Sequence, residues 1–176
     1  MNILFPKDYI TSVYQVDFKK LYEEGYRLLL FDLDNTLVMH GEPADLRAKK
    51  LFKDLREIGY KFYFLSNNKE ARVKKFCEDV KGDGYIFKAK KPSKISYLKA
   101  CEMTGVGKDK AIFFGDQIFT DILGANRAGI LSIMVKPVKK WHEEIQIIIK
   151  RFIEAPIILC YKSVNVNKIG IIPMTK

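Results

Sequence analysis

The sequence predicts a three-layer α/β fold, in which a parallel sheet of about five strands carries helices on both faces. Short, continuous apolar runs alternate with amphipathic stretches along most of the chain. The apolar runs are typical of buried strands and the amphipathic stretches of helices. Strands that alternate with helices form a parallel sheet covered on both faces. At 176 residues, the chain has room for one such domain with a sizeable core.

The expected strands are apolar runs that end in polar or turn residues, at 27–33, 61–65, 85–87, 111–114 and 130–135. The expected helices lie at 43–59, 69–80, 92–103, 119–128 and 139–154, after a short helix around 18–24. Gly59 suits a helix C-terminus, Pro92 suits a first helical turn, and Pro156 is expected to end the last helix. We expect one domain over residues 1–155 and a C-terminal tail, 156–176, of unassigned structure.

The composition is that of an ordinary globular protein with a surplus of positive charge. The net charge is +10, which favours phosphorylated, nucleic-acid or acidic-lipid partners, with plain solubility as the alternative. The three cysteines form no CxxC pair, which suits a reducing compartment, and the two distant histidines suggest no zinc site. The first ten residues lack an apolar signal-peptide core, and no run reaches the ~18 apolar residues of a spanning helix. We therefore expect a cytoplasmic protein.

Three carboxylates follow predicted strands at one edge of the predicted sheet. Asp32 and Asp34 end the first strand, and residues two apart in an extended segment point the same way. Asp116 follows the fourth strand, whose carboxyl end reaches the same edge because parallel crossovers are right-handed. Like charges repel at close range unless a cation lies between them, and oxygen ligands suit Mg²⁺. The alternative is a cluster of turn residues, since Asp and Asn favour turns.

Further polar side chains follow the other strands. Ser66 and Asn67 come after the second strand, where a hydroxyl and backbone N–H groups form an anion cradle; helix N-capping is the alternative. Lys91, directly before Pro92, is held extended and could present its ammonium group to a phosphate; a solvated basic loop is the alternative. Asp121, near the start of the fourth main helix, suits either the helix dipole or a supporting role beside the metal.

The order of these motifs resembles the haloacid dehalogenase-like (HAD) superfamily of phosphatases, whose fold is Rossmann-like. The motifs are DLDNT at 32–36, SNN at 66–68, KP at 91–92 and GDQIFTD at 115–121. A closer likeness is to the YqeG-type family of subclass IIIA, which is related to a mitochondrial phosphatidylglycerophosphate phosphatase. This likeness covers roughly residues 3–155 and includes Arg72 and Val73.

The resemblance implies a role for each matching residue. Asp32 would be the nucleophile that becomes an aspartyl-phosphate, and Asp34 would protonate the leaving oxygen and later deprotonate water. Mg²⁺ would be held by the Asp32 carboxylate, the Asp34 backbone carbonyl and Asp116. Ser66, Asn67 and Lys91 would bind the phosphoryl oxygens. Asp121 would orient Lys91 or the waters of the metal.

The spacing of the motifs leaves no room for a cap domain. Only 31 residues separate Asp34 from Ser66 and 24 separate Ser66 from Lys91, and a helix and a strand fill each interval. An open site suits a large substrate, and the resemblance suggests phosphatidylglycerophosphate. The alternatives are a soluble phosphatase for small esters or phosphoproteins, and a non-enzymatic phosphate- or nucleic-acid-binding module, although we expect no nucleic-acid partner.

A stripe of apolar residues in the last predicted helix bears on the lipid hypothesis. It consists of Trp141, Ile145, Ile148, Ile149 and Phe152, at near-helical spacing. Such a stripe either packs on the sheet as a core helix or lies in a membrane interface. The second alternative would make the cytoplasmic protein a peripheral membrane protein.

Overall fold

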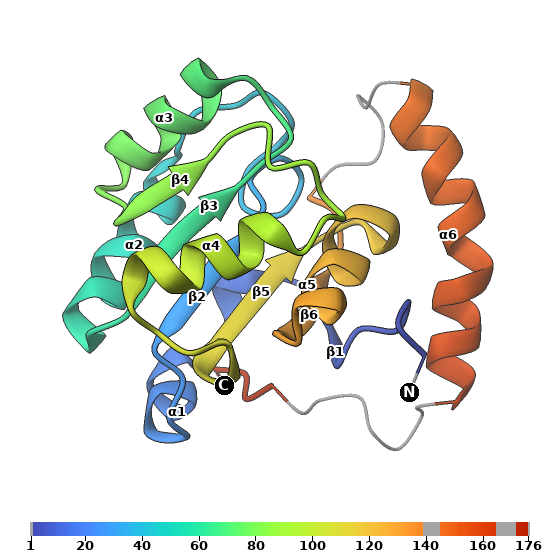
Figure 1. The fold of residues 1–176 in the computed structure, drawn as a ribbon, viewed down its shortest axis with the longest axis horizontal. Helices are drawn as coiled ribbons and strands as arrows, with labels where there is room; N and C mark the ends of the chain where they lie inside the picture. Colours follow the sequence, from blue (N-terminus) through green and yellow to red (C-terminus); the bar gives the residue numbers. More distant parts are fainter. Residues whose placement is uncertain (1, 139–144, 165–171, 176) are drawn as a thin grey trace.

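The computed structural model describes residues 2–138, 145–164 and 172–175, which form a six-stranded parallel sheet between helices (Figure 1). The strand order is β1-β6-β5-β2-β3-β4, and every neighbouring pair is parallel. The strands are β1 (Asp8–Ile10), β2 (Leu28–Phe31), β3 (Lys61–Leu65), β4 (Gly84–Ile86), β5 (Ala111–Gly115) and β6 (Leu131–Val135). The predicted fold class is therefore confirmed.

The sixth strand, β1, was not predicted. Its three residues begin with Asp8 and so form no continuous apolar run, and the strand pairs with β6 from the opposite end of the domain. Its position at the edge of the sheet depends on a contact between segments more than 100 residues apart, which local pattern does not reveal.

The helices divide between the two faces of the sheet. They are α1 (Phe18–Glu23), α2 (Leu46–Ile58), α3 (Glu70–Asp79), α4 (Ile95–Thr104), α5 (Leu123–Ala128) and α6 (Ile145–Val164). Short 3-10 turns are η1 (Val13–Gln15) and η2 (Lys108–Lys110), and η3 (Ile118–Ile122) is a π-helical turn directly before α5. The predicted helix at 119–128 is thus a π-turn followed by a short α-helix.

The four inner strands of the sheet, β2, β3, β5 and β6, are buried along most of their length, which explains their continuous apolar runs. Alternate residues of β2 point to opposite sides: Leu29 and Phe31 join one core, while Leu28 and Leu30 join the other. The first core lies under α1, α2 and α3 and is rich in aromatic rings, among them Phe52, Phe62, Phe64, Phe76 and Phe114. The second lies under α4 and α5 and includes Tyr97, Phe113 and Ala125.

Of the three helix boundaries assigned to a glycine or proline, two are wrong and one is confirmed. Gly59 ends α2 in the left-handed conformation, with φ of 107°, as predicted. Pro92 does not begin a helix: α4 starts at Ile95, and the Lys91–Pro92 peptide bond is cis. Pro156 does not end a helix either, because α6 runs through it to Val164. A proline on an exposed helix face loses one backbone hydrogen bond, and flanking turns that pack on the protein can outweigh that loss.

The last residues return to the domain. Val16 and Met174 form an antiparallel bridge, and Ile172 is buried in the first core, where its N–H donates to the Asp8 carboxylate at 2.7 Å. Of the predicted apolar stripe, Trp141 lies outside the described residues, and so do the side chains of Ile145, Ile148 and Ile149. Among the described residues, no helix is both long and apolar enough to cross a membrane.

Candidate active site

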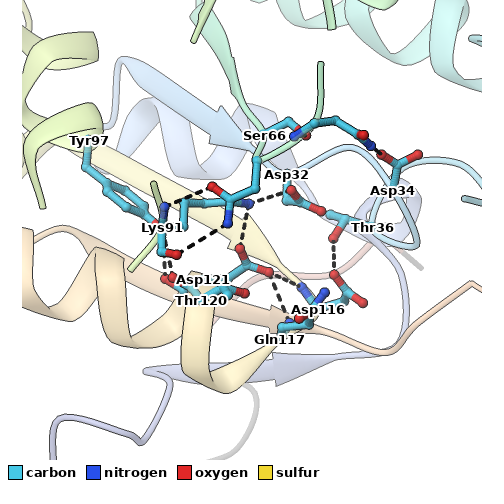
Figure 2. A network of polar contacts seen from close by, with 12 residues as sticks. Asp32, Asp34, Thr36, Ser66, Lys91, Tyr97, Asp116, Gln117, Thr120 and Asp121 are labelled. Atoms are coloured by element: carbon cyan, nitrogen blue, oxygen red, sulfur yellow. Dashed lines mark hydrogen bonds and ion pairs between the residues drawn. The ribbon is translucent and has the colours of Figure 1, made fainter. Parts of the chain in front are cut away.

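The carboxyl edge of the sheet brings together the side chains that the sequence singled out (Figure 2). Asp32 follows β2, Ser66 follows β3 and Asp116 follows β5, while Lys91 lies in the loop after β4. Asp121 comes from η3. These five residues are buried, although each carries a polar or charged group. Burying such groups is costly unless they pair with one another, so their contacts define the site.

Lys91 is the cation at the centre of this cluster. Its Nζ lies 2.5 Å from Oδ1 of Asp32 and 2.7 Å from Oδ1 of Asp121. Burial lowers the pKa of Lys91, but the negative charges of Asp121 and Asp32 outweigh it, so the net shift is upward. The ammonium group therefore stays charged and is aimed at the carboxylate of Asp32.

Asp121 accepts hydrogen bonds on both of its carboxylate oxygens. Oδ1 accepts from Lys91, while Oδ2 accepts from the backbone N–H groups of Asp116 and Gln117, each at 3.1 Å. This geometry arises because the π-turn places Asp121 over the end of β5. Such turns are frequent at functional sites. Gly115 permits the close approach, because a Cβ there would lie 2.5 Å from the Cβ of Asp121.

Asn67 links the two loops that flank Lys91 and Ser66. Its Oδ1 accepts from the Lys91 N–H at 2.9 Å, and its Nδ2 donates to the Lys91 carbonyl at 3.3 Å. The N–H of Ala89 also donates to the Ser66 carbonyl at 3.0 Å. Lys88 and Lys90 hold left-handed backbone conformations, with φ of 43° and 52°, which non-glycine residues adopt only where surrounding contacts impose them. The Asn67 side chain thus positions the Lys91 backbone.

Asp34 lies apart from the Lys91 cluster and has its own set of donors. Its carboxylate accepts from the Gly41 N–H at 2.8 Å, from Asn68 Nδ2 at 2.8 Å and from Arg72 Nη2 at 3.0 Å. Burial raises the pKa of Asp34, but the Gly41 hydrogen bond and the Arg72 charge oppose it, so the net shift is downward. Asp34 is therefore held ionised and in a defined orientation.

Three buried carboxylates form a group that suits a divalent cation. Oxygen atoms of Asp32, Asp116 and Asp121 all lie within 4.8 Å of one another. Burial raises the pKa of Asp32, and Asp121 and Asp116 add to the effect, whereas Lys91 opposes it. Since Asp121 is committed to Lys91 and two N–H groups, Asp32 and Asp116 are the better ligands, and their oxygen chemistry fits a hard cation such as Mg²⁺. The side chain of Asp34 is not a member of this group.

Three residues of the site had no predicted role. Thr36 Oγ1 donates to Asp116 Oδ1 at 3.3 Å, and Asn68 and Arg72 hold Asp34. Thr36 and Asn68 belong to the polar runs after β2 and β3, so their position in those runs was the available signal. Arg72 lies in the first turn of α3, where a lone arginine carries no local signal of its partner.

Relatives of this chain point to one class of enzyme. A family model for haloacid dehalogenase-like hydrolases matches residues 44–129. The probable phosphatase YqeG of Bacillus subtilis (strain 168) is 37% identical over 138 residues, which cover 78% of this chain and 80% of that protein. The chain therefore belongs to the haloacid dehalogenase-like hydrolase family, as its motifs predicted. Within that family, it is a phosphatase.

Solved structures of lower identity agree on the fold. An uncharacterized protein from Listeria monocytogenes serotype 4b has a TM-score of 0.52 at 18% identity, covering 67% of this chain and 85% of that chain. An uncharacterized protein from Corynebacterium glutamicum ATCC 13032 Kitasato has a TM-score of 0.51 at 18% identity, covering 71% of this chain and 93% of that chain. Both share the α/β architecture described above.

Proposed function

We propose that this phosphatase is Mg²⁺-dependent and hydrolyses a phosphate monoester through an aspartyl-phosphate on Asp32. The observation that carries the proposal is the position of Lys91 Nζ between Asp32 and Asp121, with Asp116 in the same buried group. A fixed cation beside a carboxylate nucleophile suits phosphoryl transfer, in which charge spreads over the transferring oxygens.

In the first step, a carboxylate oxygen of Asp32 attacks phosphorus and the bond from phosphorus to the leaving oxygen breaks. Asp34, which Gly41 and Arg72 hold ionised before substrate binds, takes up a proton from solvent when the substrate enters and gives it to that oxygen, so the product leaves as an alcohol. In the second step, Asp34 takes a proton from a water molecule that attacks the same phosphorus. Inorganic phosphate leaves and the Asp32 carboxylate is restored. Lys91 and the Ser66 hydroxyl bind the phosphoryl oxygens in both steps, with Asn67 holding the Lys91 backbone in place.

The metal would be held by the carboxylates of Asp32 and Asp116 and by the backbone carbonyl of Asp34. A bound Mg²⁺ supplies positive charge that offsets the negative charge of the phosphoryl group. Thr36 donates to Asp116 and so orients that carboxylate toward the site. Asp121 holds Lys91 near Asp32 rather than contacting the metal.

The proposal is tested by phosphate release from 4-nitrophenyl phosphate with Mg²⁺, with EDTA and after Mg²⁺ is restored. Asp32→Asn should abolish release while circular dichroism and thermal unfolding stay close to those of the wild type. Asp109→Asn, which alters an exposed aspartate in η2, is the matched control and should retain full activity. Turnover by Asp32→Asn, or turnover unaffected by EDTA, would contradict the assignment.

We further propose a phosphatidylglycerophosphate-type lipid as the substrate and a cytoplasmic location at the membrane surface. Only α2 lies between β2 and β3, and only α3 between β3 and β4, so no cap closes the site at these points. A cavity of about 250 Å³ adjoins it, lined in part by Thr36, Arg47 and Lys136. Such a lipid carries a second phosphate, which these two cations suit.

The second candidate substrate class is a small phosphate ester or a phosphoprotein, which an open site also admits. Assays on phosphatidylglycerophosphate, small esters and phosphopeptides at equal concentration separate the two candidates. Turnover of the lipid far above the others supports the first proposal, and the reverse order supports the second. The +10 charge agrees with either anionic substrate and does not decide between them.

A further inference from the structure

The outward face of α6 is apolar and exposed. Phe152, Ile153, Leu159 and Val164 have 76%, 56%, 68% and 67% of their surface exposed, and Pro156 is exposed between them. Positions 152, 156, 159 and 163 lie close to one line along a helix of 3.6 residues per turn. Ser163 is the one polar residue on this line. Isolated exposed apolar residues are ordinary, but a continuous apolar strip on one helix marks an interaction site.

The opposite face of α6 packs on the domain, so the apolar strip points away from the domain. Glu154 Oε1 accepts from the Phe119 N–H at 3.1 Å, and Ile157 and Ile158 pack against Ile118 and Ile122 of η3. Tyr161 is buried, with its ring 5.6 Å from that of Phe5. The described part of the helix thus packs one face on the domain and leaves the other exposed.

The charges around this face indicate what covers it. Among residues 152–164 of α6, the one acidic residue, Glu154, is buried, and the one basic residue, Lys162, is exposed with its Nζ 4.8 Å from the centroid of the Tyr9 ring. Exposed lysines also gather at the carboxyl edge of the sheet, namely Lys69, Lys88, Lys90, Lys94 and Lys136. In Figure 1, α6 stands on the side of the molecule toward which β3, β4 and β5 point. An apolar strip on a protein whose carboxyl edge carries exposed lysines matches an anionic lipid surface.

We propose that the strip of Phe152, Ile153, Pro156, Leu159 and Val164 docks the enzyme on an anionic bilayer. The side chains would enter the boundary between headgroups and acyl chains, with α6 lying in the membrane plane. The choice of a bilayer rests on the proposed lipid substrate, because docking brings the catalytic edge to a substrate held in that bilayer. Phe152 belongs both to this strip and to the predicted stripe, and the strip continues beyond Pro156 because the helix does.

The test is co-sedimentation with vesicles of phosphatidylglycerol and phosphatidylcholine, beside vesicles of phosphatidylcholine alone. The wild type should bind the mixed vesicles, and binding should weaken as salt rises. The double variant Phe152→Asp/Leu159→Asp should bind at least about 100-fold more weakly, because burying each of these two side chains is worth at least about tenfold in affinity. Leu46→Asp, at a residue 85% exposed in α2, is the matched control and should bind like the wild type.

Hydrolysis of 4-nitrophenyl phosphate, measured on all variants, separates this inference from the proposed function. The double variant should keep that activity, because both residues lie outside the catalytic cluster. If the wild type hydrolyses no ester but still binds the mixed vesicles, the proposed function is wrong and the docking surface is supported. No binding of the wild type to mixed vesicles at low salt would overturn the inference. So would a dimer in light scattering that the double variant dissociates, since the strip would then join two copies.

Discussion

Lys91 and Asp121 form a buried ion pair, with Nζ and Oδ1 2.7 Å apart, on the carboxyl edge of the sheet. The same ammonium group contacts Asp32 at 2.5 Å, so one lysine connects a supporting carboxylate to the proposed nucleophile. Asp121 is in turn fixed by the N–H groups of Asp116 and Gln117. The position of the cation therefore depends on the backbone that follows β5.

Asp121→Asn tests whether this pair positions Lys91 for catalysis. The amide can still accept a hydrogen bond but lacks the charge, so Lys91 should be held less firmly near Asp32. We expect kcat to fall about 10- to 100-fold with little change in KM. Steady-state kinetics should be paired with urea unfolding, because weakening a buried pair also lowers stability. A variant with lower stability and unchanged kcat would show a purely structural role.

Gly115→Ala tests the close contact between β5 and the π-turn. The new Cβ would lie 2.5 to 2.7 Å from Cβ, Cγ and Oδ2 of Asp121, so the turn must shift. We expect a loss of about 1–3 kcal/mol in the free energy of unfolding, together with reduced activity. Gly107→Ala is the control, because its main obstacle is the tip of the exposed Asp109 side chain, which can rotate away. Equal stability of the two variants would contradict the prediction.

Asp34→Asn tests proton transfer at the leaving group. The amide is close in shape but cannot donate or take up the required proton. In the first turnover, measured as a burst, we expect alcohol release from alkyl phosphates to slow about 10²- to 10⁴-fold, while release of 4-nitrophenol, which leaves without protonation, should slow much less. Because the second step also needs Asp34, aspartyl-phosphate should accumulate on Asp32, visible by mass spectrometry of acid-quenched protein. Equal losses on both substrate types would assign Asp34 another role.

Arg47→Ala combined with Lys136→Ala tests the cavity beside Thr36. Both side chains line this cavity but lie outside the carboxylate cluster. We expect kcat/KM for phosphatidylglycerophosphate in detergent to fall at least about tenfold, since charge-assisted hydrogen bonds to one phosphate would be lost. Activity on 4-nitrophenyl phosphate should be unchanged. A parallel loss on both substrates would mean that the two cations do not select the second phosphate.

Much of the fold and of the candidate site was predictable from local pattern. Continuous apolar runs identified β2, β3, β5 and β6, because strands buried on both faces need apolar side chains at every position. Once those strands were parallel, their carboxyl ends had to meet at one edge, which brought Asp32, Ser66 and Asp116 together. The resemblance of the motifs then supplied the family, which a relative at 37% identity bears out.

Other features depend on contacts between distant segments. Strand β1 exists because it pairs with β6, and α6 continues through Pro156 while its inner face packs on η3. Arg72 reaches Asp34 from 38 positions along the chain, which no local spacing indicates.

The sequence by itself therefore determined the layers of the fold, the edge that carries the site and the residue types gathered there. The apolar periodicity and the polar residues that follow each strand are local properties, so they can be identified from the order of residues. Only the tertiary structure decided that Lys91 bridges Asp32 and Asp121 and that Asp34 is held apart by Arg72. It also decided which face of α6 remains exposed. Those outcomes depend on which side chains meet across the fold and which positions packing leaves in water.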